Sequence, residues 1–285
     1  MAALQRASVA LALFLLGCSS GPAEKPVAGG GVRLVDSAPA RALGEQVQKI
    51  LGTARPDGTN GILGFVKAGD RVKPLLDPAA VRRSRGAATV ELPLRGGGEV
   101  RVADRKSEVA VGFRITGAPA WEIAVADELG VHDAPGASRA WLQRVHVEGV
   151  EDHVLFRERP AKNELRYRID VSRVAGMRLV SHELEFLDKD GAPRLRVTQP
   201  YLVDATGERR DAALELEGCA YDADPRMPWG RPVRAPEATS CELVVRWNGA
   251  GVSYPAVLDP SWSTTCSPQD ISGDRAEMVL SLIHI

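Results

Sequence analysis

The sequence has few aromatic residues, almost no net charge and no long apolar run after its first residues. Aromatic side chains make up 5% of the 285 residues, and 36 Lys and Arg oppose 37 Asp and Glu, for a net charge of -1. This balance gives no electrostatic reason to expect nucleic acid as a partner. Beyond the N-terminus no apolar run reaches the ~18 residues of a membrane-spanning helix. The body of the chain is therefore expected to be soluble.

The motifs of common enzyme and cofactor sites are also missing. The chain contains no G-x-G-x-x-G or P-loop for nucleotides, no G-x-S-x-G nucleophile elbow and no H-E-x-x-H metal site. The histidines stand apart from one another, at His132, His146, His153, His182 and His284. We therefore expect a protein without a cofactor or a resident metal and without catalytic activity.

What the sequence does contain is turn residues and alternating strands. There are 28 Gly and 19 Pro, and between the turns apolar residues recur with the period of two that indicates half-buried strands. Roughly ten such strands predict a mainly β protein, an antiparallel β-sandwich that is either one large unit or two in tandem. The clearest alternating segments are 90–94, 109–115, 121–125, 165–171, 184–186, 195–197 and 243–247.

One segment, residues 38–52, has helical rather than strand periodicity. Ser37 can cap its start, and a proline follows in the first turn. The apolar residues with i, i+4, i+7 and i+8 spacing are Leu43, Val47, Ile50 and Leu51. This pattern predicts a short amphipathic helix that packs on a neighbouring sheet.

The N-terminus has the form of an export signal. Within residues 1–17 a short basic region precedes an apolar stretch that is too short to span a bilayer. The stretch ends in Leu-Leu-Gly-Cys18, which resembles the lipobox of bacterial lipoproteins. We expect cleavage before Cys18, lipid attachment to its thiol and a flexible tether over 18–36. The membrane is then a partner through this lipid, and the absence of an acidic residue after Cys18 favours the outer membrane.

The remaining cysteines are Cys219, Cys241 and Cys266. Because exported proteins fold in an oxidising compartment, Cys219 and Cys241 are predicted to form a disulfide around an irregular, proline-rich loop. A zinc site is the alternative, but no C-x-x-C and no nearby histidine support it. Cys266 has no predicted partner.

Five further residues are weak functional candidates. Asp152 and His153 lie in the densest polar cluster and have the residue types of half a hydrolase site, but without a nucleophile elbow a charged loop before a strand is the favoured interpretation. Asp188 and Asp190 resemble part of a calcium loop, but the glycine and the later ligands of an EF-hand are misplaced, which favours a hairpin turn. Trp229, in the cysteine-bounded loop, is the tryptophan expected to be exposed to a glycan.

Residues 150–262 resemble a known family. The stretches V-E-D-H-V-L-F, E-L-R-Y-R-I-D-V, L-E-F-L-D-K-D-G and Y-P-A-V-L-D-P-S-W are similar to the β-rich leader domain of myxobacterial-type surface lipoproteins. In that family Kelch-like or other β repeats often follow the leader. The resemblance implies a presentation module of a larger binding or scaffold lipoprotein, with an extracellular protein or a glycan as its ligand. It carries over no catalytic residue.

The expected organisation is therefore a signal peptide (1–17), a tether (18–36), a small helix-containing region (37–85), a β-sandwich leader domain (86–262) and a linker stub (263–285). The last six residues or so resemble adapter read-through, so the C-terminus is expected to be truncated. The competing function is an envelope-anchored hydrolase or carbohydrate-binding lipoprotein with its active domain missing or unrecognised.

Overall fold

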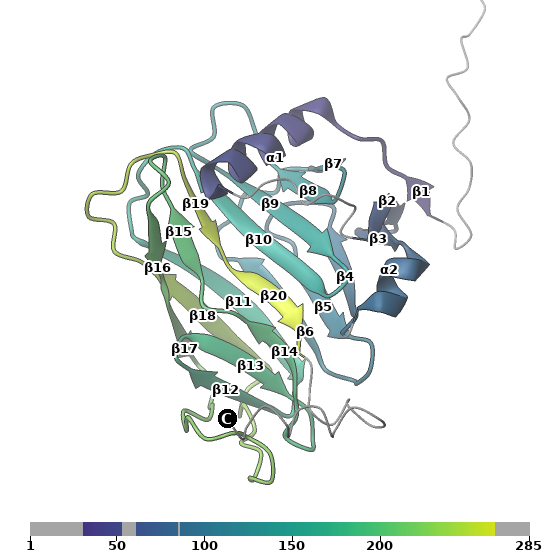
Figure 1. The fold of residues 1–285 in the computed structure, drawn as a ribbon, viewed down its shortest axis with the longest axis vertical. Coiled ribbons are helices and arrows are strands. Elements are labelled where there is room, and N and C mark those ends of the chain that lie inside the picture. Colours follow the sequence, from purple (N-terminus) through teal and green to yellow (C-terminus); the bar gives the residue numbers. More distant parts are fainter. Residues whose placement is uncertain (1–30, 53–60, 85, 266–285) are drawn as a thin grey trace, which may run out of the picture.

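The computed structural model describes residues 31–52, 61–84 and 86–265. Strands hold 50% of the residues and helices 9%, which confirms the predicted mainly β class. Two large antiparallel sheets pack face to face, and a helix lies across the outer face of one of them (Figure 1). The strands within residues 61–76 belong to the same sheet as strands formed by later segments of the chain.

The first sheet has nine strands. Its pairings are antiparallel, and the cross-over from β6 to β11 brings the middle of the chain beside the N-terminal strands. The strands, in spatial order, are β1 (Val32–Arg33), β2 (Ile62–Ala68), β3 (Arg71–Leu76), β4 (Ala88–Pro93), β5 (Val100–Asp104), β6 (Ala110–Ile115), β11 (Glu164–Arg173), β18 (Ser240–Arg246) and β17 (Ala213–Glu217).

The second sheet has eleven strands and branches at β10. This strand pairs with β9 along one edge; along its other edge the first half pairs with β20 and the second half with β19. The main path is β12 (Gly176–Val180), β13 (Glu183–Leu187), β14 (Pro193–Val197), β20 (Ser261–Thr264), β10 (Gly149–Phe156), β19 (Ala256–Asp259), β15 (Tyr201–Val203) and β16 (Arg209–Asp211). The branch consists of β9 (Arg139–His146), β8 (Leu129–His132) and β7 (Ile123–Ala126).

The main core lies between the two sheets, where the apolar side of each alternating strand meets the other sheet. Phe113 of β6 stacks on Trp262 of β20, with ring centroids 3.9 Å apart and planes within 7°. Tyr167 of β11 meets the same indole edge-on at 5.9 Å. These aromatic contacts join strands that are far apart in the sequence, and each buries a large apolar area.

The predicted helix is present as α1 (Ala38–Leu51). Ser37 caps it, since its side chain accepts from the Ala40 amide, and Gly52 ends it in a left-handed conformation with φ of 65°. The apolar face of α1 packs on the outer face of the eleven-stranded sheet in a second core, as predicted. A second, shorter helix, α2 (Pro78–Arg83), was not predicted.

The seven alternating segments all overlap strands of the structure, but the described chain contains about twice the expected number of strands. Strands β9 and β10 show why some were missed. Both are buried on both faces, one face by the opposite sheet and the other by α1. A strand with two buried faces does not alternate between apolar and polar residues.

Candidate functional site

Strand β10 places two neighbouring ionisable residues on opposite faces of its sheet. Successive side chains of a strand point to opposite faces. Asp152 therefore faces the main core and contacts Tyr167 of the other sheet, whereas His153 faces outward and contacts Asp259 of β19. The prediction of a charged loop at this point is wrong, because β10 runs without interruption through both residues.

The carboxylate of Asp152 is 1% exposed and is held by two uncharged donors. Gln143 Nε2 of β9 donates to Oδ1 at 2.7 Å, and the Tyr167 hydroxyl of β11 donates to Oδ2 at 2.8 Å. Burial raises the pKa of Asp152 to about 6, while the two hydrogen bonds oppose that rise. The group thus changes its charge near neutral pH while enclosed in the core.

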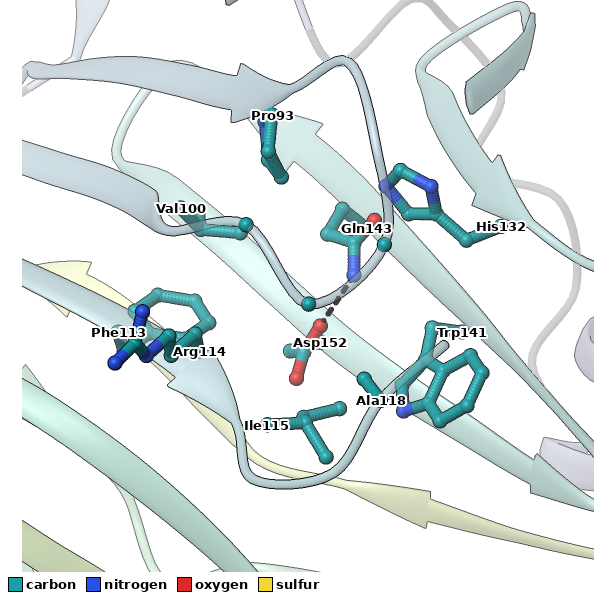
Figure 2. Close-up of a pocket in the computed structure, with 13 residues that line it drawn as sticks. Pro93, Val100, Phe113, Arg114, Ile115, Ala118, His132, Trp141, Gln143 and Asp152 are labelled. Atoms are coloured by element: carbon teal, nitrogen blue, oxygen red, sulfur yellow. Dashed lines mark hydrogen bonds between the residues drawn. The ribbon is translucent and has the colours of Figure 1, made fainter. Parts of the chain in front are cut away.

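A small cavity of about 20 Å³ adjoins this carboxylate (Figure 2). It is lined in part by Gln143, His132 and Trp141. The Gln143 Oε1 and His132 Nε2 atoms are buried without a hydrogen-bond partner among the described residues. Burial lowers the pKa of His132 to about 4, so this ring is neutral at physiological pH. The cavity has room for about one water molecule and none for an organic substrate.

The loop between Pro93 and Val100 borders the cavity on the side of the nine-stranded sheet (Figure 2), and its glycines 96–98 line the cavity. A Cβ at Gly96 would lie 2.4 Å from the Pro119 carbonyl oxygen, and one at Gly97 would lie 2.7 Å from that of Ala118. Gly97 also has a φ of 76°. The loop can therefore approach residues 118–119 this closely only because it has no side chains.

The outer face of β10 holds a second buried group. His153 Nε2 lies 3.2 Å from Asp259 Oδ1 and 3.6 Å from Glu151 Oε2, and the ring is 2% exposed. Burial lowers the pKa of His153, but the close approach and charge of Asp259 and the charge of Glu151 outweigh it, and the net shift is upward. Tyr201 also hydrogen-bonds to Asp259, whose pKa is lowered because these contacts outweigh its burial.

These geometries decide what the polar groups can do chemically. Asp152 and His153 are not brought together, so the predicted half-site of a hydrolase does not form from that pair. His153 and Asp259 do resemble the base and orienting acid of a triad. Within the described ranges, however, no serine, threonine or cysteine side chain hydrogen-bonds to His153, and the ring is enclosed.

The sequence reasoning missed the partners Gln143, Tyr167, Tyr201 and Asp259. One signal was available: Asp152 lies two residues from both Val150 and Val154 and so shares their face of the strand, which marks it as a polar group on an apolar face. A buried polar group requires hydrogen-bond partners. The identity of those partners depends on sheet pairing and on the packing of the second sheet, which no local pattern contains.

The predicted disulfide between Cys219 and Cys241 is confirmed, with Cα atoms 5.6 Å apart. The loop that it closes packs against edge strand β12: Arg178 donates to the carbonyl oxygens of Asp224 and Pro225. Trp229 in this loop is half-buried, and its indole Nε1 is buried without a partner among the described residues. Its ring is therefore not the fully exposed platform that was expected.

Asp188 and Asp190 form the hairpin turn between β13 and β14. Asp188 Oδ1 accepts from the amides of Asp190 and Ala192 at 2.9 Å each, and Oδ2 accepts from Arg194 Nε at 2.7 Å. The Asp188 carboxylate is thus occupied in shaping the turn. In the described part of the chain, no group of three or more His, Cys, Asp or Glu side chains is arranged so that it could hold a metal ion.

Cys18 and Cys266 lie outside the described residues. Of the helices that the structure describes, none is both long enough and apolar enough to cross a bilayer. No protein-family model, no curated protein and no solved structure matches this chain.

Proposed function

We propose that the protein is an exported, lipid-anchored and non-catalytic component of the cell envelope, the leader or presentation module of a larger surface lipoprotein. The observation that carries the proposal is the Cys219–Cys241 disulfide. Structural disulfides persist in oxidising compartments and are rare in the cytosol. Combined with the lipobox-like sequence before Cys18, the disulfide supports transport across a membrane and attachment to it.

The buried polar groups support the non-catalytic part of the proposal. Asp152 adjoins a cavity of about 20 Å³, whereas pockets for small organic ligands measure roughly 300–1,000 Å³. His153 and Asp259 are also enclosed, which gives a substrate no access to the pair. Buried polar groups of this kind, such as the Asp152 carboxylate with its two donors, act on the stability and uniqueness of the fold.

The test of anchoring is metabolic labelling with a clickable palmitate analogue in cells that express the full chain. Wild type is expected to take up the label and to fractionate with membranes, and Cys18→Ser is expected to lose both properties. Cys266→Ser is the matched control, because it removes a cysteine that the anchor does not need. Equal labelling of wild type and Cys18→Ser would contradict the proposal.

The alternative, an envelope-anchored hydrolase, is favoured by one observation, the 3.2 Å approach of His153 Nε2 to Asp259 Oδ1. A fluorophosphonate probe that labels wild type but not His153→Gln would support this alternative, since a base that activates a hydroxyl nucleophile is required for labelling. We expect no labelling of either protein.

A further inference from the structure

The outer face of the nine-stranded sheet carries rows of charged side chains. In one half of this face the arginines are paired with glutamates. Toward β17, Arg166 Nη1 lies 2.9 Å from carboxylate oxygens of both Glu217 and Glu242. Arg246 pairs with Glu164 and lies 3.0 Å from Glu215. Each arginine in this half therefore has at least two carboxylate partners.

The neighbouring half, around β6 and β11, contains two arginines without such ion pairs. Arg114 and Arg168 stand directly opposite each other in the β6–β11 register. Like charges in directly opposed positions destabilise a sheet unless a counter-charge lies nearby. Glu242 stands opposite Arg168 in the β11–β18 register but pairs with Arg166. Neither Arg114 nor Arg168 has a carboxylate within 4.0 Å of its guanidinium in the described structure, and Arg168 Nη2 donates to the Ser240 hydroxyl at 2.9 Å.

A hollow lies next to these arginines. Two adjoining depressions of about 320 and 470 Å³ share Glu99, Asp170 and Ser172 in their lining. Arg114 and Arg168 line the smaller depression, and Gly112 lines the larger one. Gly112 lies directly opposite Asp170, and the carboxylate of Glu99 occupies the space in which a Cβ of Gly112 would stand. The two depressions beside the arginine pair therefore contain the carboxylates of Glu99 and Asp170.

The other groups around the hollow are hydrogen-bonding groups of both kinds. Asp170 has no ion-pair partner in the described chain; its Oδ1 accepts from the Ser172 amide, which leaves Oδ2 as an acceptor. Ser172, Thr239 and Ser240 contribute hydroxyls. Two guanidiniums bind one carboxylate well because each presents a planar fork of donors. The carboxylates beside them accept hydrogen bonds from hydroxyl groups.

We propose that this hollow, the Arg114–Arg168 site, binds an acidic saccharide. The ligand's carboxylate lies between the guanidiniums of Arg114 and Arg168, and its hydroxyls donate to Asp170. This inference names a ligand class for a surface-presented module, but it does not depend on the anchor. Labelling at Cys18 and binding at this site can therefore fail separately.

Titration calorimetry of the full chain in non-ionic detergent micelles, with trigalacturonate as the probe, tests the site. Wild type is expected to bind, and Arg114→Ala and Arg168→Ala are each expected to weaken binding about five- to tenfold, since each removes charge-assisted hydrogen bonds. Arg168→Lys keeps the charge but loses the fork, so an intermediate Kd is expected. Affinity should fall as salt rises, because the site is open to solvent.

Arg246→Ala is the matched control, because Arg246 is a half-buried arginine of the same face that has its own carboxylate partners. It is expected to bind trigalacturonate as wild type does. Unchanged far-UV circular dichroism in every variant verifies that the fold is intact. The proposal is overturned if trigalacturonate does not bind, if the Arg114 and Arg168 variants bind it as well as wild type does, or if inorganic phosphate or neutral maltotriose binds equally well.

Discussion

Asp152 on the inner face of β10 and Asp259 beside its outer face are both carboxylates that burial should make more basic, yet their pKa values move in opposite directions. The pKa of Asp152 rises to about 6, and that of Asp259 falls. The difference lies in the partners. Asp152 receives hydrogen bonds from a neutral amide and a neutral phenol, whereas Asp259 faces the imidazole of His153. In this protein the charge of the partner, more than the depth of burial, decides whether a buried carboxylate is ionised.

The largest expected effect comes from removing the outer carboxylate. Asp259→Asn leaves His153 buried without its main counter-charge, and we expect the free energy of unfolding in urea at pH 6 to fall by about 3 kcal/mol. Asp211→Asn is the matched control, because it makes the same change in an exposed pair with Arg209. The control is expected to lose less than about 0.5 kcal/mol. Equal losses would mean that the outer pair is no stronger than a surface ion pair.

The inner carboxylate should be visible in the pH dependence of stability. Its folded pKa of about 6 lies above the unfolded value of 3.8, so its contribution is fully present below pH 3.8 and is lost as pH rises through 6. Between pH 4 and 7 this group should lower the stability by about 3 kcal/mol. Asp152→Asn should lack this component in urea titrations at several pH values. If the free energy of unfolding of the variant fell with pH as steeply as that of wild type, Asp152 would not be the group responsible for the pH dependence.

The outer site titrates in a different window, which separates the two. The pKa of His153 is raised, so its contribution is present below pH 6.5 and is lost as pH rises through the higher folded value. In the same urea titrations, the free energy of unfolding of His153→Gln should no longer decline above pH 6.5. It should still decline between pH 4 and 6, where Asp152 titrates. Loss of both components in either single variant would mean that the two faces of β10 titrate as one unit.

A smaller effect is expected from the donor on the inner side. Tyr167→Phe removes one of the two hydrogen bonds to Asp152, and we expect a loss of about 2 kcal/mol at pH 7, because the ionised carboxylate then keeps a single donor. The same substitution in an Asp152→Asn background should cost clearly less. Additive losses in this double-mutant cycle would rule out a special role for the hydrogen bond.

The smallest effect is expected from the donor on the outer side. Tyr201 is half-buried and hydrogen-bonds to Asp259, which His153 also contacts. Tyr201→Phe should therefore lower the free energy of unfolding by only about 1 kcal/mol. A loss as large as that of Tyr167→Phe would show that the charge of His153 does not stabilise Asp259, and would remove the contrast between the two carboxylates.

Some elements of the fold follow from local patterns. Ser37, the spacing from Leu43 to Leu51 and Gly52 define α1 almost to the residue, because capping and amphipathic periodicity are properties of contiguous sequence. The disulfide was predictable from Cys219 and Cys241, since few pairings were available. The strands with one polar face were found for the same reason as the helix.

Other elements were hidden from such patterns. Strand β10 is buried on both faces, so its residues show no alternation, and its two ionisable groups resembled a solvated loop. The Arg114–Arg168 site was also invisible, because the two residues are 54 positions apart and meet only through the β6–β11 pairing. Local sequence contains neither the pairing partner of a strand nor what covers its second face.

The sequence by itself determined a mainly β chain with one N-terminal helix and a disulfide-closed loop, since each depends on residues close in sequence or on a single pair of cysteines. The tertiary structure alone decided that Asp152 meets Gln143 and Tyr167, while its neighbour His153 meets Asp259. Adjacent residues of a strand point in opposite directions. Their surroundings are therefore set by the elements that pack on each face, and those elements come from distant parts of the chain.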